Sequence, residues 1–302
     1  MTQSPHLGLV CITQSDAVRY RTVTRTRYLS FGEDERYVLL DELYRHNLGV
    51  LFKALDFCRD HAIRLYRVNT NLFPLNDWED GIGWAVLGTL AEHMAEFGPR
   101  ADALHIRVLV HPEQYVVLNS LRPEVIVNSV RVLESQALIF DRLGLPRSAW
   151  AGVNIHGGKG GRSDELVETI AALPDGVRSR LTLENDEHAY SAAAILDVCE
   201  RAGVPMVFDA HHHVVSEGLT SLEDASVSEY THLARTTWQP PHWQVVHLSN
   251  GRTGVNDSKH SDLIETVPSA FREVNWIEVE AKSKEEAIFG LRNGWVGGLG
   301  RG

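Results

Sequence analysis

Short apolar segments rich in β-branched and aliphatic residues recur eight times along the chain, and each is separated from the next by a stretch long enough for a helix. The pattern predicts strands at residues 7–12, 64–69, 106–111, 151–156, 181–185, 205–210, 244–249 and 276–281. Strands that alternate with helices along a whole chain are typical of a parallel sheet covered by helices, and eight such units close into a barrel. We therefore expect the α/β class and a single (β/α)8 barrel, the TIM-barrel fold.

The segments between the strands show the helical period of 3.6 residues. The first of these intervals places on one face Leu43, Leu51, Leu55 and Cys58, and the third places on one face Val125, Val132, Leu133, Gln136 and Phe140. Pro123 lies where the second of these helices should start, and Gly144 and Gly203 lie where helices should end. We find no repeat, low-complexity tract or linker, so we expect one TIM-barrel domain over residues 1–302 rather than two domains.

The composition of the 302 residues, 43% apolar and 23% charged, is typical of globular proteins that remain in solution. No apolar run approaches the roughly 20 residues that span a bilayer, so no membrane association is expected. The first 16 residues lack the basic and apolar regions of a signal peptide, which predicts a cytoplasmic location. Cys11, Cys58 and Cys199 are widely spaced within apolar segments, as expected of reduced thiols rather than a disulfide framework.

The formal net charge of −11 argues against general nucleic-acid binding, but the charge is unevenly distributed. Residues 18–28 contain two tyrosines and no acid, together with four arginines: Arg19, Arg21, Arg25 and Arg27. A basic segment with aromatic residues can hold a phosphate backbone, and the alternative is a solvated surface loop. The chain also contains 15 histidines, and bound divalent cations would offset part of its acidic total.

Ionisable residues lie at the carboxyl ends of six of the predicted strands. These residues are His111, His156, Glu184, Asp209, His247 and Glu280. Side chains at the carboxyl ends of barrel strands converge at one mouth, where TIM-barrel active sites are built. A single strand-end histidine is more often a hydrogen-bonded core residue, but six such residues together indicate a functional centre.

Acids and imidazoles crowded into one barrel mouth repel one another and lose hydration, and divalent cations are the usual remedy. Two more residues extend the set: His212 follows Asp209 in a D-x-x-H pattern, and His260 lies in the loop after the seventh strand. Eight side chains are too many for one ion, which takes about four to six ligands, so the pattern predicts two or three metal ions. Such clusters typically hydrolyse phosphate esters. A donor set without cysteine suits Mn²⁺ or Zn²⁺.

Seven segments of the chain closely resemble the UV damage endonucleases. They are Leu-Phe-Pro-Leu at 72–75, Val-His-Pro-Glu-Gln-Tyr at 110–115, Asn-Ile-His-Gly-Gly-Lys-Gly at 154–160, Leu-Glu-Asn-Asp at 183–186, Phe-Asp-Ala-His-His at 208–212, Val-His-Leu-Ser at 246–249 and Val-Glu-Ala-Lys at 279–282. Their order and spacing match across roughly residues 6–290, and the motifs are specific to that family among the apurinic-endonuclease-like and xylose-isomerase-like barrels.

The resemblance implies a DNA repair endonuclease whose substrate is double-stranded DNA with UV lesions, with no obligate protein partner. It implies cleavage immediately 5′ to cyclobutane pyrimidine dimers and (6-4) photoproducts, and at abasic sites. It carries the ligand role onto the eight residues above, with Mn²⁺ favoured over Zn²⁺ and Mg²⁺, and we expect Glu184, His247 and Glu280 to be catalytic. Gln114 and Tyr115 would form a wedge that replaces the flipped lesion, or Tyr115 would only cap the barrel rim. The four arginines and Lys159 would contact phosphates.

Three departures from the family pattern limit what the resemblance implies. Many relatives have a tyrosine in the first strand, where this chain has Gly8-Leu9-Val10, so an aromatic residue that probes the lesion or contacts a phosphate would be missing there. Relatives carry a histidine after the Leu-Phe-Pro segment, where this chain has Asn76-Asp77-Trp78, so Asp77 is a candidate substitute. In some relatives a lysine two positions before the seventh-strand histidine can carry a metal-bridging carbamate, and here that position is Val245. Two ions are therefore expected, and a third is open.

Two alternative functions remain. A metal-dependent sugar isomerase on the same kind of barrel would also carry His, Glu and Asp at its strand ends, because fold does not fix function. Such an enzyme would need neither the arginine-rich segment nor the wedge. A catalytically silent DNA-damage binding protein would keep these features and lose ligands, whereas all eight ligand positions are filled here. Nicking of UV-irradiated plasmid and ketose formation from aldoses would separate the three.

Overall fold

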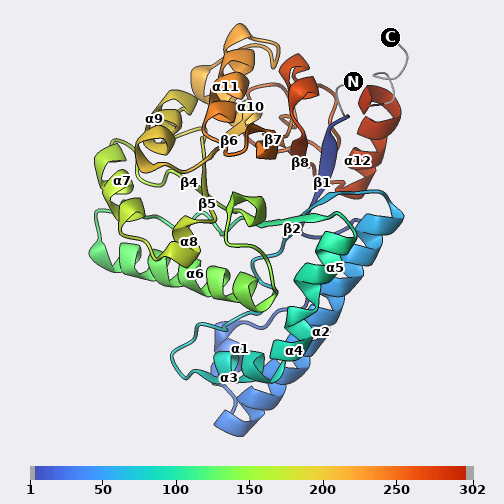
Figure 1. Cartoon of the computed structure of the whole chain (residues 1–302), viewed down its shortest axis with the longest axis vertical. Coiled ribbons are helices and arrows are strands. Elements are labelled where there is room, and N and C mark those ends of the chain that lie inside the picture. Colours follow the sequence, from blue (N-terminus) through green and yellow to red (C-terminus); the bar gives the residue numbers. More distant parts are fainter. Residues whose placement is uncertain (1–3, 297–302) are drawn as a thin grey trace.

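The computed structural model describes residues 4–296 and contains a closed barrel of eight parallel strands in the order β1 to β8 (Figure 1). The strands are β1 His6–Val10, β2 Leu65–Val68, β3 Arg107–Val110, β4 Val153–His156, β5 Leu181–Glu184, β6 Met206–Asp209, β7 Val245–Leu248 and β8 Trp276–Val279. Each overlaps a predicted strand, and β1 pairs with β8 to close the barrel. The prediction of a (β/α)8 barrel is confirmed.

Helices surround the barrel, and Figure 1 shows α6, α7, α9, α11 and α12 along its outside. The helices are α1 Arg25–Leu29, α2 Glu33–Asp60, α3 Ile82–Thr89, α4 Ala91–Ala95, α5 Phe97–Ala103, α6 Pro123–Arg142, α7 Ser163–Ala171, α8 Asp175–Arg178, α9 Ala192–Ala202, α10 Ala210–Glu217, α11 Ala225–Thr236 and α12 Glu285–Leu291. Short helical turns are η1 Ala149–Ala151, η2 Pro241–Trp243, η3 Ser269–Glu273 and η4 Arg292–Val296. In Figure 1, α1, α3 and α4 gather around the end of α2 that extends away from the barrel.

The long helix α2 buries the predicted face, since Leu43, Leu51, Leu55 and Cys58 are all buried. Three acids lie in its first turn, where the positive end of the helix dipole stabilises them. Glu35 also accepts a hydrogen bond of 2.9 Å from the backbone N–H of Gly32, which satisfies one of the free donors at the helix start.

Helix α6 begins at Pro123 as predicted, but its buried face is shifted from the expected one. Leu133 and Phe140 are buried, whereas Val125 and Val132 are only half-buried. Gly144 and Gly203 follow their helices with φ values of +70° and +67°, a left-handed conformation that glycine adopts without steric cost. Both predicted helix ends are confirmed.

The barrel interior contains apolar side chains below several of the ionisable strand ends. Side chains alternate along a strand, so residues two positions apart share a face. Two positions before His111, Asp209 and His247 stand the apolar Leu109, Val207 and Val245, which form one buried cluster together with Leu65, Trp238 and Trp276. Beneath these three strand ends the interior is therefore apolar, whereas β4, β5 and β8 place the buried polar residues Asn154, Thr182 and Glu278 two positions before theirs.

The amino-terminal end of the barrel is closed by Arg107, whose side chain is fully buried. Its guanidinium donates to the backbone oxygens of Trp150 at 2.8 Å, Trp243 at 2.7 Å and Ala149 at 2.8 Å. It also lies over the rings of three tryptophans, with 4.7 Å to the ring centroid of Trp150. These neutral partners hold a buried cation by hydrogen bonds and cation–π contacts.

Two further expectations can be compared with the structure. Cys11, Cys58 and Cys199 are free thiols, as expected. Among residues 4–296, no helix combines the length and the apolar character needed to cross a membrane.

Candidate metal centre

All six strand-end residues lie at the carboxyl mouth of the barrel. His156, Glu184 and Asp209 are the last residues of β4, β5 and β6, and His247 lies within β7. His111 and Glu280 directly follow β3 and β8. His212 comes from the first turn of α10, and His260 comes from the loop between β7 and β8. The structure thus brings the eight predicted ligands to one end of the barrel.

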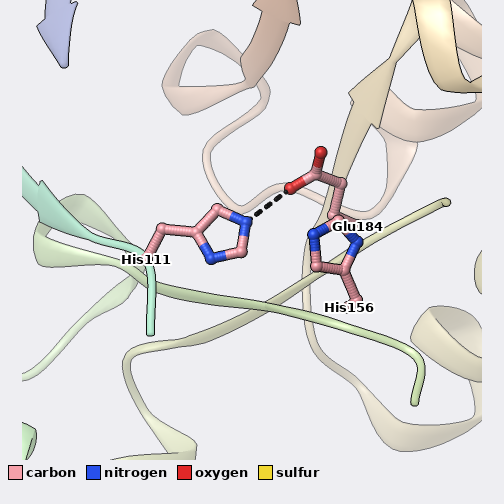
Figure 2. Close-up of side chains that lie close together, drawn as sticks. All are labelled: His111, His156 and Glu184. Carbon is pink, nitrogen blue, oxygen red and sulfur yellow. Dashed lines mark hydrogen bonds and ion pairs between the residues drawn. The ribbon is translucent and has the colours of Figure 1, made fainter. Parts of the chain in front are cut away.

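Glu184 is the centre of this group and is 1% exposed. Its Oε2 lies 3.0 Å from His111 Nε2, and its Oε1 lies 2.9 Å from His247 Nδ1. Figure 2 shows the imidazole of His111 pointing at the Glu184 carboxylate, with the ring of His156 beside it. Asn154 donates to Glu184 Oε2 at 2.6 Å and so fixes the direction of the carboxylate.

Two groups of side chains have donor atoms within 4.8 Å of one another, and Glu184 belongs to both. One group is His111, His156 and Glu184, and the other is Glu184, Asp209 and His247. Two buried polar atoms in these groups, His156 Nδ1 and Asp209 Oδ2, have no hydrogen-bond partner in the protein. Because buried polar atoms rarely remain unpaired, unpaired donor atoms here fit divalent cations as their partners.

The remaining ligands complete the same cluster. His212 Nδ1 lies 3.3 Å from Glu184 Oε1 and 3.8 Å from Asp209 Oδ2. His260 Nδ1 lies 3.8 Å from Glu280 Oε2. A cavity of about 380 Å³ opens over these side chains, lined among others by His111, His156, Glu184, His212, His260 and Glu280. Its size and its polar lining suit a phosphate group together with its metal ions.

The carboxylates and imidazoles of the cluster shift each other's pKa values. Burial alone would raise the pKa of Glu184, but the imidazoles of His247 and His156 lower it well below its usual range. Burial would lower the pKa of His247, and the carboxylates of Glu184 and Glu280 instead raise it to about 10. In the metal-free protein the protonated imidazole of His247 therefore acts as a cation that the carboxylates require, a role that a divalent cation would also fill.

Three residues of this region were not predicted. Arg67 of β2 and Glu278 of β8 are buried at the mouth, and Glu187 lines the cavity with Oε2 3.7 Å from His212 Nε2. A charged residue inside an otherwise apolar strand was the available signal for Arg67 and Glu278. For Glu187 the signal was its place three residues after Glu184 in an acidic segment.

Two of the three departures from the family pattern have structural explanations. Val245 packs in the buried apolar cluster below His247. Asn76 is buried and donates to Ser135 Oγ at 2.6 Å, which ties its loop to α6. The suggestion that Asp77 substitutes for a ligand is not supported, because its carboxylate pairs with Arg131 at 3.7 Å and does not line the cavity.

The predicted wedge residues lie on the loop between β3 and α6. Gln114 lines the cavity of the metal cluster, whereas the side chain of Tyr115 is 67% exposed. Lys159 lies on the neighbouring loop between β4 and α7, and its backbone N–H donates to Asn119 Oδ1 at 2.8 Å. Asn119 is fully buried, so it fixes the two loops to each other. Tyr115 is therefore an exposed aromatic residue next to a residue that lines the cavity.

The arginine-rich segment differs in part from its prediction. Arg19, Arg21, Arg25 and Arg27 are exposed, as a phosphate-binding surface requires. The segment is not a plain loop, because Arg25 and Arg27 belong to α1, and Arg25 lies 4.3 Å above the ring of Trp78.

The aromatic part of that prediction is wrong. Tyr28 is buried and donates to Asp80 Oδ2 at 2.6 Å, and the half-buried Tyr20 has its hydroxyl 2.7 Å from that of Tyr66. Tyr20 thus anchors the segment to β2, and Tyr28 anchors it to the loop before α3. They are therefore not free to stack on nucleic acid bases.

Comparison with known proteins decides between the functions that this geometry allows. The sequence model of the family described as UV-endonuclease UvdE matches residues 5–296. The chain belongs to this family. It is 53% identical to the UV DNA damage endonuclease of Deinococcus radiodurans, over 95% of both chains. It is 51% identical to that of Nostoc sp., over 97% of this chain and 91% of the relative. The family resemblance inferred from the motifs is confirmed, and the UvdE-family chain is an endonuclease and thus a hydrolase.

Solved structures agree with the family assignment. SacUVDE superimposes with a TM-score of 0.79 at 27% identity, covering 96% of this chain and 98% of SacUVDE. An L-ribulose 3-epimerase superimposes with a TM-score of 0.54 at 13% identity, which shows the shared barrel alone. Membership of the UvdE family therefore favours the endonuclease over both the sugar isomerase and the silent binding protein.

Proposed function

We propose that the protein is a metal-dependent DNA repair endonuclease that hydrolyses the phosphodiester immediately 5′ to UV photoproducts in double-stranded DNA. Its substrates are cyclobutane pyrimidine dimers and (6-4) photoproducts, and abasic sites are a further substrate. The observation that carries the proposal is the convergence of eight His and carboxylate side chains around Glu184 in a UvdE-family barrel. The whole chain acts as one endonuclease domain, needs no obligate protein partner and works in the cytoplasm.

The metal-binding part of the proposal rests on the donor atoms of the centre. His111, His156 and Glu184 hold one ion and Asp209, His247 and Glu184 hold another, with His212, His260 and Glu280 completing the ligand set. Nitrogen and oxygen donors without thiolate suit Mn²⁺, and Zn²⁺ and Mg²⁺ are the alternatives. Bound ions supply Lewis-acid polarisation of the phosphate and a nucleophile available near neutral pH.

The chain's own residues then position the substrate. Glu184, His247 and Glu280 are the catalytic residues of the proposal, because the His247 imidazole contacts both carboxylates at the centre of the predicted ligand set. Tyr115 stands exposed beside the cavity and replaces the stacking that the lesion loses when it leaves the duplex, while Gln114 hydrogen-bonds a base edge. A photoproduct stacks and pairs poorly, so it costs less to flip than normal bases, and this difference favours damaged DNA.

Phosphate contacts come from the exposed arginines Arg19, Arg21, Arg25 and Arg27 and from Lys159. These cations offset the acidic net charge locally, where the DNA backbone passes. Arg19 also bonds Asp16, with Nε 2.8 Å from Oδ1, so we expect it to contribute the least of the four.

The test uses a duplex oligonucleotide with one cyclobutane dimer, labelled at either end, and a matched undamaged duplex. Protein stripped of metal by a chelator is reloaded with Mn²⁺, Zn²⁺ or Mg²⁺. We expect cleavage directly 5′ to the dimer, a 3′-hydroxyl that a polymerase extends, and the highest rate with Mn²⁺. Equal cleavage of the undamaged duplex, or cleavage that persists without metal, would contradict the proposal. Ketose formation from aldoses in the same preparation would favour the isomerase instead.

A further inference from the structure

Arg67 lies inside the carboxylate side of the centre and has no assigned role in the ligand set above. It is the third residue of β2, its side chain is 8% exposed, and it pairs in register with Val10 of β1. Because β1 separates β2 from β8, the guanidinium reaches across one strand to its partners. Only a long side chain held in a fixed direction makes this contact.

The guanidinium bridges two carboxylates of one strand end. Its Nε donates to Glu278 Oε1 at 2.8 Å, and its Nη2 donates to Glu278 Oε2 at 3.1 Å and to Glu280 Oε1 at 2.5 Å. Glu278 and Glu280 are two residues apart, so both face the barrel interior. The fork of a guanidinium matches a carboxylate in this way, whereas an ammonium group does not.

Glu278 in turn holds a predicted ligand. His247 Nε2 lies 2.7 Å from Glu278 Oε2, while His247 Nδ1 faces Glu184 Oε1 at 2.9 Å. A ligating histidine commonly donates its second ring N–H to a carboxylate, which fixes the ring orientation and leaves the other nitrogen for the metal. Arg67 Nη2 also lies 2.9 Å from His247 Nε2, so Arg67, Glu278 and His247 all contact one another.

We propose that Arg67 is a positioning residue of the metal centre, which holds Glu280 directly and His247 both directly and through Glu278, so that this side of the centre is assembled before a metal ion binds. The inference rests on the proposed metal-dependent function and adds to it the residue that organises two ligands. Its carboxylate partners are 2% exposed for Glu278 and 13% for Glu280, so without Arg67 they would face each other as buried anions. Such a pair is costly to bury, and the ligands would rearrange.

Arg107 offers a matched control for the loss of a buried arginine. It lies on the adjacent strand β3, it is also buried, and it donates to backbone oxygens at the opposite end of the barrel rather than to ligands. A general effect of removing a buried guanidinium should appear in both positions. An effect on metal binding should appear only at Arg67.

The experiment measures Mn²⁺ binding to chelator-treated protein by calorimetry and by the loss of the free Mn²⁺ resonance signal, together with thermal unfolding. The variants are Arg67→Met, Arg67→Lys and Arg107→Met. We expect Arg67→Met to weaken Mn²⁺ binding by about 10- to 100-fold, the usual cost of losing a partner that supports a ligand. Arg67→Lys should recover part of this loss, and Arg107→Met should lower the unfolding temperature with Mn²⁺ affinity unchanged.

Wild-type Mn²⁺ affinity in Arg67→Met would overturn the inference, as would tighter binding or an additional ion, which would make Arg67 a competitor of the metal. If Arg67→Met does not fold, Glu278→Gln takes its place, because it removes the carboxylate that binds both Arg67 and His247 and keeps the size of the side chain. An unchanged Mn²⁺ affinity in Glu278→Gln would then overturn the inference. Failure of the proposed function is distinguishable, since the wild-type protein itself would then bind no Mn²⁺.

Discussion

Two arginines buried on neighbouring strands show how differently the two ends of the barrel are built. At the amino-terminal end, Arg107 has neutral partners, three backbone oxygens and tryptophan faces, and burial lowers its pKa to about 9. At the carboxyl mouth, burial would lower the pKa of Arg67, but Glu278 and Glu280 raise it well above its usual range. The same side chain thus closes the core at one end and organises an anionic site at the other, in agreement with the division of TIM barrels into a stability face and a catalytic face.

The comparison predicts that changes at the mouth affect cleavage far more than stability. Glu184→Gln keeps the size and the hydrogen bond from Asn154 but removes the charge that two ligand groups share. We expect single-turnover cleavage of UV-damaged DNA to fall at least about 100-fold, with less bound metal by mass spectrometry and a folded protein by circular dichroism. If Glu184→Gln and His247→Ala both retained near wild-type cleavage and metal content, the mouth would not be a catalytic centre.

Changes at the amino-terminal end of the barrel should lower stability far more than cleavage. Arg107→Met removes three hydrogen bonds and leaves the buried backbone oxygens of Ala149, Trp150 and Trp243 without their partner. We expect the free energy of unfolding in urea to fall by about 3 kcal/mol, while cleavage per folded molecule stays unchanged. A large loss of cleavage in fully folded Arg107→Met would show that the two ends are not independent.

Lowering the pH should destabilise the metal-free protein through the carboxylates at the carboxyl mouth of the barrel. Burial would raise the pKa of Glu278, but Arg67 and His247 lower it to about 2, from 4.5 in the unfolded chain. A depressed carboxyl pKa stabilises the fold above the unfolded value, and this stabilisation is lost as the pH falls through the folded value.

We therefore expect the free energy of unfolding to drop between about pH 5 and pH 2, by about 2–3 kcal/mol more in wild type than in Glu278→Gln. Denaturant titrations at each pH measure both curves. Parallel curves would mean that Glu278 is not held as an anion by its neighbours.

The wedge loop at the mouth should affect recognition rather than chemistry. Tyr115→Ala, alone or with Gln114→Ala, should cost about 1–3 kcal/mol in lost stacking. The loss should be greater for a well-paired cyclobutane dimer than for an abasic site that is already unstacked, with metal content intact. Single-turnover cleavage of both substrates gives the comparison. An equal loss on both would refute the wedge, and loss of bound metal would indicate damage to the mouth itself.

The smallest effects are expected from the exposed arginines. Replacing Arg19, Arg21, Arg25 and Arg27 by glutamine should flatten the salt dependence of DNA binding, each lost phosphate contact reducing the logarithmic slope by about 0.9. The control replaces Arg59, Arg147 and Arg201, which are exposed and paired with acids near helix ends at the opposite side of the barrel. An unchanged slope in the first variant would leave this segment as solvated surface.

Much of the fold could be predicted because strand and helix periods are local properties of the sequence. All eight strands and the ends of α6 and α9 follow from apolar runs, Pro123, Gly144 and Gly203. The ligand positions could be predicted as well, because parallel barrel strands carry their carboxyl ends to one mouth. His212 and His260 could be predicted as ligands from their positions shortly after the sixth and seventh strands.

Contacts between distant segments were not predictable in the same way. The partners of Arg67 lie 211 and 213 residues away, and nothing local in β2 indicates that β8 supplies two acids. Tyr20 and Tyr28 were assigned to the surface from their arginine neighbours, but Tyr66 and Asp80 hold them inward. Both cases depend on tertiary packing, which composition and periodicity do not encode.

The most direct test of the central claim, that the mouth of this barrel cleaves UV-damaged DNA with the help of metal ions, is plasmid nicking. Supercoiled plasmid, irradiated or not, is incubated with chelator-treated protein with and without Mn²⁺, and relaxed circles are counted after electrophoresis. We predict nicks in irradiated plasmid with Mn²⁺, and neither in unirradiated plasmid nor without the metal. Equal nicking of both plasmids, or nicking of irradiated plasmid that the chelator does not reduce, would contradict the account.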